Sequence, residues 1–197
     1  MRKAWIVAAA GLLVALPLMV HAATFEIDSA HTSAQFAVKH LMVSTVRGTL
    51  GKVSGTANVD ESDLAKSSVE ATIDVKGVDT REEKRDNHLR GPDFFDADNH
   101  PTIHFKSTKV ETLGGDKFNI AGDLTIRGIT KPVVLAVEGS PKPFKDPFGN
   151  ERMGGVARAR INRKDFGMAF SKTMDNGGVV VADDVDITID LELTRRK

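Results

Sequence analysis

The polar side chains best suited to chemistry lie together in one stretch of this 197-residue chain, residues 79–101. Arg85 and His88 are three residues apart in a segment with helical signals, so we expect them to share one helix face. Arginine offers a forked set of donors to a phosphate or carboxyl group, and histidine donates or accepts according to its tautomer. With Asp86 between them, the two could orient the polar end of a bound molecule. The alternative is a capping network that fixes the helix to the rest of the protein.

Two phenylalanines, Phe94 and Phe95, follow this polar cluster directly. They cannot both hide on one face of a short turn, so we expect the segment to pack across the mouth of a cavity. Further phenylalanines also fall in expected loops, where a simple core would not need them. These are Phe144, Phe148, Phe166 and Phe170. The surplus of loop phenylalanines favours a bound apolar ligand.

Other chemistries find little support in the residue types. The chain has no cysteine, which excludes a thiolate nucleophile and cysteine-bound zinc. His100 and His104 have a spacing that suits a metal on a helix, but in extended chain they lie about 13 Å apart. No Gly-x-Ser-x-Gly elbow is present, and Ser54 and Ser171 lack an activating motif. We therefore expect no metal and no catalytic residue.

The polar cluster needs a helix to position it, and residues 81–98 are the expected helical insert. Thr80 is a suitable N-cap, with Glu83 three residues on to complete a capping box. Gly91 and Pro92 should end the helix, with the glycine in the left-handed conformation.

On either side of the insert the pattern is that of β-strands. Ala34, Phe36, Val38 and His40 alternate with polar residues, so one face of their strand is buried. The expected strands span 25–27, 32–41, 46–59, 68–76, 102–110, 118–126, 130–139, 153–161 and 184–193. Residues 140–150 read as a Pro/Gly-rich loop.

Consecutive hairpin signals and the glycines of the 46–59 stretch favour an antiparallel up-and-down barrel of roughly eight strands, the short 25–27 segment being the ninth range. The two-residue alternation alone is also compatible with a β-sandwich. Small residues are frequent on the inward face: Ala34, Ala57, Ala71, Ala157, Ala159 and Gly122. They predict a hollow interior with an apolar lining, wide enough for one small ligand.

Residues 1–22 have a basic start, an apolar run and small residues near the end, which predicts a secretory signal peptide. An uncleaved signal anchor is the alternative. Residues 23–197 would form one domain, with 25 basic and 27 acidic side chains once Arg2 and Lys3 are removed. That balance argues against general binding to nucleic acid or to anionic membranes. The only Trp is Trp5 and there is no Tyr, so the girdle of an outer-membrane barrel is also missing.

Several ordered motifs resemble the YceI-like family over nearly all of residues 23–197. They are Ile27–Thr32, Phe36–Leu41, Val46–Gly48, Arg85–Arg90, Asp93–Asp96, His100–Phe105, Gly122–Pro132 and Arg163–Met168. The family often has Trp where Phe25 stands and Ser where Thr32 stands, which leaves the fold assignment intact.

This resemblance implies a lipocalin-like barrel exported to the periplasm, holding a long amphiphilic lipid such as a polyisoprenoid in an apolar channel. It implies a bound lipid but no further cofactor, and leaves a homodimer open. A secreted or periplasmic hydrolase or protease on the same fold is the alternative. The residues expected to contact the ligand are Phe36, Val38, His40, Arg85, His88, Leu89, Phe94, Phe95, Phe105, Phe144, Phe148, Phe166, Met168 and Phe170.

Overall fold

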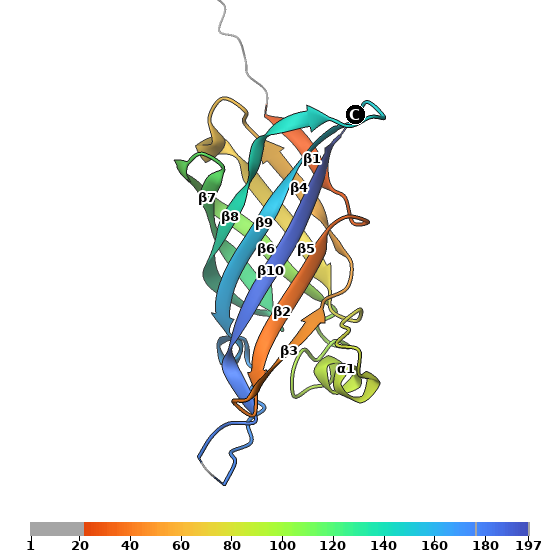
Figure 1. Ribbon diagram of the computed structural model, residues 1–197, viewed down its shortest axis with the longest axis vertical. Helices are drawn as coiled ribbons and strands as arrows, with labels where there is room; N and C mark the ends of the chain where they lie inside the picture. The colour runs from red at the N-terminus through yellow and green to blue at the C-terminus, as the bar shows by residue number, and fades with distance from the viewer. Residues whose placement is uncertain (1–21, 176, 197) are drawn as a thin grey trace, which may run out of the picture.

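A computed structural model describes residues 22–175 and 177–196, and its strands form one tall barrel (Figure 1). The expected signal peptide lies almost entirely outside the described residues. The strands are β1 (Ala23–Ile27), β2 (Ser33–His40), β3 (Ser44–Thr49), β4 (Val53–Val59), β5 (Ser68–Asp74), β6 (Thr102–Gly114), β7 (Lys117–Ile126), β8 (Ile129–Lys145), β9 (Glu151–Asn162) and β10 (Val181–Arg195). One α-helix, α1 (Glu83–Arg90), and two 3-10 turns, Leu64–Lys66 and Arg163–Phe166, complete the fold of the described residues.

The ten strands occupy eight positions around a closed ring. All neighbours are antiparallel in the order β1-β4-β5-β6-β7-β8-β9-β10, and β1 pairs with β10 to close the ring. β1 and β2 both pair with β10, one after the other along its length, and together they fill one position of the ring. β3 pairs with β2 and β4 pairs with β1, so β3 and β4 together fill the next position. Closure confirms the barrel predicted from the sequence and is incompatible with a sandwich of two sheets.

Glycines allow the wall to bend between β3 and β4. The Gly51 N–H donates to the Asp74 carbonyl at 2.9 Å, and a Cβ at Gly51 would lie only 2.7 Å from that oxygen. Gly55 has a φ of 146°, which only glycine adopts easily, and a Cβ there would meet Glu70 O at 2.1 Å. The single strand expected over residues 46–59 is therefore two strands joined by a bend.

The prediction of a loop at residues 140–150 is wrong for residues 140–145, which belong to strand β8. β8 continues to Lys145, which pairs with Glu151 across a short turn. The ladder shifts register between Ser140 and Phe144, and this irregularity accommodates the prolines that suggested a loop. The Asp146 carboxylate then accepts the N–H groups of Phe148 and Asn150 to form the turn.

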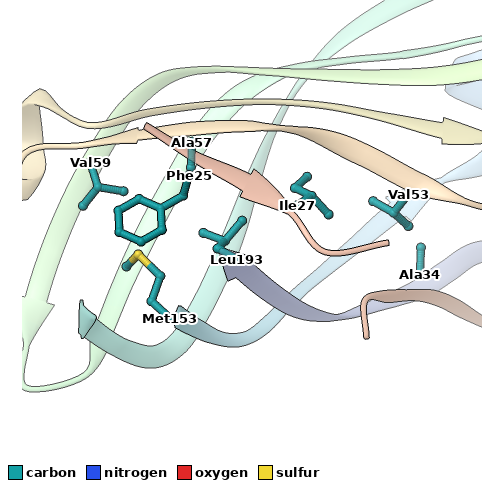
Figure 2. Packing of buried hydrophobic residues seen from close by; sticks show 8 residues of the cluster. All are labelled: Phe25, Ile27, Ala34, Val53, Ala57, Val59, Met153 and Leu193. Atoms are coloured by element: carbon teal, nitrogen blue, oxygen red, sulfur yellow. The ribbon is translucent and has the colours of Figure 1, made fainter. Parts of the chain in front are cut away.

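Strand β1 lies toward the upper end of the barrel (Figure 1) and carries Phe25. Its ring is fully buried, and Figure 2 shows Val59 and Met153 close beside it. The Arg195 guanidinium lies 5.4 Å from the ring centroid and forms 2.6 Å ion pairs with Glu61 and Glu151. Phe25 is thus packed inside the barrel beneath an arginine that two glutamates hold in place.

The lower end carries the helical insert, but its caps differ from those predicted. Glu82, and not Thr80, is the N-cap of α1, and Gly91 is extended (φ −73°, ψ 177°) where a left-handed glycine was expected. Thr80 instead donates its N–H and its hydroxyl to the buried Asp86 carboxylate, at 2.8 and 2.5 Å. The predicted helix is present, but contacts with the rest of the protein determine which residue caps its N-terminus. Among the described residues, no helix is long and apolar enough to cross a membrane.

Candidate functional site

The upper half of the barrel encloses an apolar cavity of about 190 Å³, here called the upper chamber. β1 and β4 to β10, the strands of the closed ring, all contribute to its wall. Besides aliphatic residues, the wall carries Phe105, Phe118, Met153 and four alanines, Ala57, Ala71, Ala157 and Ala159. Among the described residues, the only ones with polar side chains that line this wall are serines 67, 68 and 140, and none of the lining residues is charged. This half of the barrel can hold hydrocarbon and offers little to a polar group.

A second cavity of about 260 Å³, the lower chamber, lies beneath the first. Here the wall is only partly made of strands. β2, β3, β6, β7, β9 and β10 contribute, whereas α1 with the turns after it, the segment between β9 and β10, and Leu50 of the β3–β4 bend supply the remainder. Four phenylalanines line this chamber: Phe36, Phe94, Phe95 and Phe170. Four polar residues accompany them: His40, Arg85, His88 and Arg163.

The two chambers meet at a ring of aliphatic side chains that belongs to both linings. We call this ring the neck; its members are Leu50, Ile103, Ile126, Ile161 and Ile187. They come from the β3–β4 bend and from four different strands. Because the same side chains face both spaces, the two chambers adjoin at this ring along the length of the barrel. Together the chambers reach the size of about 300–1,000 Å³ that is usual for small-molecule sites.

Two channel phenylalanines occupy space left by glycines on neighbouring strands. A Cβ at Gly48 would lie 2.6 Å from the Phe36 ring, and one at Gly122 would lie 2.5 Å from the Phe105 ring. Gly122 therefore makes room for the Phe105 ring and does not leave empty space in the interior. The empty space lies beside the alanines that line the upper chamber.

Arg163 is structural although it lines the lower chamber. Its side chain is only 3% exposed, and burial lowers the pKa of its guanidinium from the ordinary value. It donates to three backbone carbonyls and one carboxylate: Ala182, Met168, Val181 and Asp183. With its donors engaged, Arg163 ties the residues after β9 to the start of β10.

The other three polar residues, Arg85, His88 and His40, differ in how many hydrogen bonds their side chains already make within the protein. Arg85 donates to the hydroxyl and the carbonyl of Thr80, at 2.7 and 2.9 Å. The His88 ring is 2.9 Å from Asp93 and packs edge-on against Phe94 and Phe170, with centroids 5.0 Å apart in both cases.

His40 is the least engaged of the three. In the described part of the chain, its ring has no hydrogen-bond partner. Both interpretations of the polar cluster thus have a basis: Asp86 and part of Arg85 anchor the insert, while His40, His88 and the rest of Arg85 face the channel.

The structure brings most of the predicted site residues together. Ten of them line the lower chamber: Phe36, Val38, His40, Arg85, His88, Leu89, Phe94, Phe95, Met168 and Phe170. Phe105 lines the upper chamber. Phe166 is buried among core residues behind the channel and lines neither chamber.

Phe144 and Phe148 do not join the site. Both lie at the upper end of the barrel, near the β8–β9 turn, and Phe148 is 89% exposed. Neither lines a chamber. The sequence analysis named no residue of the neck and, apart from Phe105, none of the upper wall as ligand contacts. The alternation of apolar and polar residues in β7 and β10 could have identified these wall residues. The inward positions of the two strands include Phe118, Ile120, Ile187 and Ile189.

A separate polar cluster near the upper rim contains Asp28, His31, Asp146, Arg152 and Glu192. Arg152 donates to Asp28 at 2.9 Å, to Asp146 at 2.7 Å and also to Glu192. The Arg152 guanidinium holds the pKa values of the Asp28 and Asp146 carboxyls well below their usual range, and Asp28 raises the pKa of His31. The arginine occupies the acceptors that a metal would need, so the cluster is an ion-pair network.

The hydrolase alternative would be favoured by a serine hydroxyl bonded to a histidine ring. No serine hydroxyl among the described residues bonds to a histidine ring; Ser44, for example, bonds to the backbone carbonyl of His40. The His104 ring bonds the hydroxyls of Thr72 and Thr102 on the exposed face of β6.

Comparison with known proteins gives consistent matches over the barrel. The model of the YceI-like domain matches residues 25–193. A UPF0312 protein of Vibrio vulnificus is 37% identical over 175 residues, which cover 88% of this chain and 92% of that protein. Its name states no enzyme activity.

Two solved structures are similar in fold. The YceI protein of Campylobacter jejuni has a TM-score of 0.68 and 31% identity, covering 81% of this chain and 90% of that one. A polyisoprenoid binding domain from Saccharophagus degradans has a TM-score of 0.63 over 89% of this chain and 99% of that one. At 13% identity, the latter supports the fold alone.

Proposed function

The chain belongs to the YceI-like domain family, and on this premise we propose that it holds one long-chain amphiphile, of polyisoprenoid type, in the two-chamber channel. The observation that carries the proposal is the one-sided polarity of the channel. Charged and imidazole side chains line the lower chamber only, and the upper chamber is lined by apolar residues and three serines.

The tail would pass the neck and lie in the upper chamber. Each methylene group moved from water into such a space gains about 0.8 kcal/mol. The neck is aliphatic on all sides, so a flexible isoprenoid chain meets no unpaired polar group on its way.

The head would remain in the lower chamber beside His40, Arg85 and His88. Among the described residues, no carboxylate lines this chamber, and all its polar side chains can donate hydrogen bonds. Such a lining suits a head that accepts hydrogen bonds, such as a phosphate, a carbonyl or a hydroxyl group. The name of the Saccharophagus degradans domain, which states polyisoprenoid binding, is consistent with this ligand class.

We further propose that the protein acts in the periplasm, as a single processed domain from residue 23 to residue 197. The motivation is the signal-like character of residues 1–22. In that compartment a lipid-filled barrel would serve in carriage, storage or a stress response.

The proposal is tested with delipidated protein and isoprenoid alcohols and phosphates of graded length. A bound ligand should appear as a one-to-one mass adduct in native mass spectrometry. It should also stabilise the fold, by about 2.7 kcal/mol at a hundredfold excess over Kd. If neither the adduct nor the stabilisation appears with any chain length, the carrier function is wrong.

A further inference from the structure

An exposed apolar tip stands at the lower end of the barrel, where β2 turns into β3. Its three residues are Leu41, Met42 and Val43, which are 38%, 59% and 82% exposed. Single exposed apolar residues are ordinary, but three in succession at the end of a hairpin are not explained by folding.

The backbone of the tip makes its sequence more unusual. Leu41 and Met42 have φ values of 52° and 61°, in the left-handed region. Hairpin turns with two such residues strongly prefer asparagine and glycine. Here a turn that favours small polar residues carries leucine and methionine. A position that breaks a local rule without a gain in packing is expected where the side chains serve function.

The tip is continuous with the lower chamber. Val38 and His40 precede it on β2, Val46 follows it on β3, and all three line the chamber. The Leu41 N–H also donates to Val180 O at 2.9 Å, and Val180 lines the chamber as well. Whatever the tip contacts therefore lies at the mouth of the space proposed for the ligand head.

Exposed cations flank the tip. Lys39 and Arg47 lie on the two strands of the hairpin, and Lys172 lies in the segment that runs beside it. The Lys172 ammonium is 5.9 Å from the ring of Phe170, a lining residue of the lower chamber. Because the whole chain has a formal net charge of zero, any attraction to anionic groups must come from such local cations.

We propose that residues 41–43 insert into the surface of a phospholipid bilayer, so that the lower chamber opens against the membrane. This inference rests on the proposed function, since an amphiphile with a long tail must leave a bilayer to enter the barrel. Three side chains are too few for a stable protein interface, which needs about 800 Å² from each partner. They are sufficient for shallow insertion, which apolar contact and nearby cations both strengthen.

The test uses the processed protein purified from the cells that make it, with its N-terminus established by mass spectrometry. Binding is measured by co-sedimentation with vesicles of phosphatidylethanolamine that contain a minor fraction of phosphatidylglycerol. The variant Met42→Asp/Val43→Asp should bind the vesicles roughly tenfold or more weakly than the unaltered chain. The matched control is Phe148→Asp, which charges an even more exposed apolar residue at the opposite end and should leave vesicle binding unchanged.

Bound lipid is measured on the same samples by native mass spectrometry. The tip variant should retain the lipid with which it was purified, which separates docking from holding. Unaltered protein that carries lipid but does not sediment with vesicles would overturn the docking inference and leave the carrier function standing. An equal loss in both variants, a loss in Phe148→Asp alone, or a tip that instead joins two copies in size-exclusion chromatography would also overturn it. Absence of any bound or bindable lipid would contradict the carrier function itself.

Discussion

The upper and lower chambers share the neck but are built in different ways. The upper wall comes largely from regular strands whose inward positions are mostly aliphatic or alanine, with Phe105, Phe118 and Met153 among them. The lower wall combines strands with an insert of one short helix and several turns. The insert adds Phe94, Phe95, Arg85 and His88, while His40 comes from strand β2. The strands of the closed ring supply an apolar interior, and the insert together with the end of β2 supplies the polar groups.

This division matches the two parts of an amphiphile. A strand ladder satisfies its own backbone groups, so its interior needs no polar side chains and can remain empty for a tail. An insert must be anchored by side chains, as Thr80, Arg85 and Asp86 show, and its anchoring brings polar groups to the mouth. Selectivity for the head should therefore respond to changes below the neck, and selectivity for tail length to changes above it.

The largest effect is expected from filling the upper chamber. The double variant Ala71→Phe/Ala159→Phe places two rings where a long tail would lie. Excluding about four methylene groups costs about 3 kcal/mol, or on the order of 100-fold in Kd for a decaprenyl-length ligand. A farnesyl-length ligand, short enough for the lower chamber, should bind as before. Titration followed by native mass spectrometry compares the two lengths, and an equal loss for both would mean that the chambers do not act separately.

A smaller effect should distinguish the hollow wall from the packed core. Ala34 is almost fully buried and lines neither chamber, although the sequence placed it on the inward face with Ala71 and Ala159. Ala34→Phe should therefore lower the free energy of unfolding by about 1–3 kcal/mol or more through overpacking. Ala159→Phe should cost less than about 1 kcal/mol, because its ring enters empty space. Urea unfolding measures both, and similar losses would indicate that the upper chamber is filled by the protein itself.

Below the neck, His40 and Arg85 should separate head binding from anchoring. His40→Ala should weaken a ligand with a phosphate or carbonyl head by about 1 kcal/mol, roughly fivefold. It should leave a plain hydrocarbon and the Tm of the empty protein unchanged, since no described residue loses a hydrogen bond.

Arg85→Ala is the comparison for that variant. It should also lower the Tm of the empty protein, because Thr80 loses two hydrogen bonds. If His40→Ala weakens headed and headless ligands equally, the imidazole is part of the wall and not of a head site.

The smallest expected effect concerns the ion-pair network at the upper rim. Arg152 lowers the pKa values of Asp28 and Asp146 in the folded protein. A lowered folded-state pKa contributes stability that is present above the unfolded value of about 4 and is lost as the pH falls toward the folded value. Arg152→Met should thus destabilise the protein more near pH 7 than near pH 3. Urea unfolding at both pH values tests this, and a pH-independent difference would mean that the carboxylates do not depend on Arg152.

The sequence predicted what depends on local pattern. Alternation placed Phe36, Val38 and His40 on an inward face, and glycines marked the bend between β3 and β4. Motifs around Arg85 and Phe94 located the insert at the mouth. These features follow from side-chain period and turn chemistry, which act over a few residues.

What the sequence missed depends on distant partners. Thr80 is a good N-cap by type, but the buried Asp86 carboxylate takes its hydroxyl and Glu82 caps the helix instead. Phe148 resembles Phe170 as a loop phenylalanine, yet β8 extends further than its prolines suggested and carries Phe148 to the opposite end. The neck assembles residues from five places in the chain, and no local pattern distinguishes them from other inward aliphatic residues.

The central claim, a head below the neck and a tail above it, can be tested directly with single tryptophans. The chain has no tryptophan after Trp5, so the processed protein offers a dark background. The Phe118→Trp variant reports on the upper chamber and the Phe95→Trp variant on the lower. A polyisoprenoid with a quencher at the end of its tail should quench the indole of Phe118→Trp strongly and that of Phe95→Trp weakly, and a quencher on its head should give the reverse. Equal quenching in both variants, or the opposite order, would contradict the account.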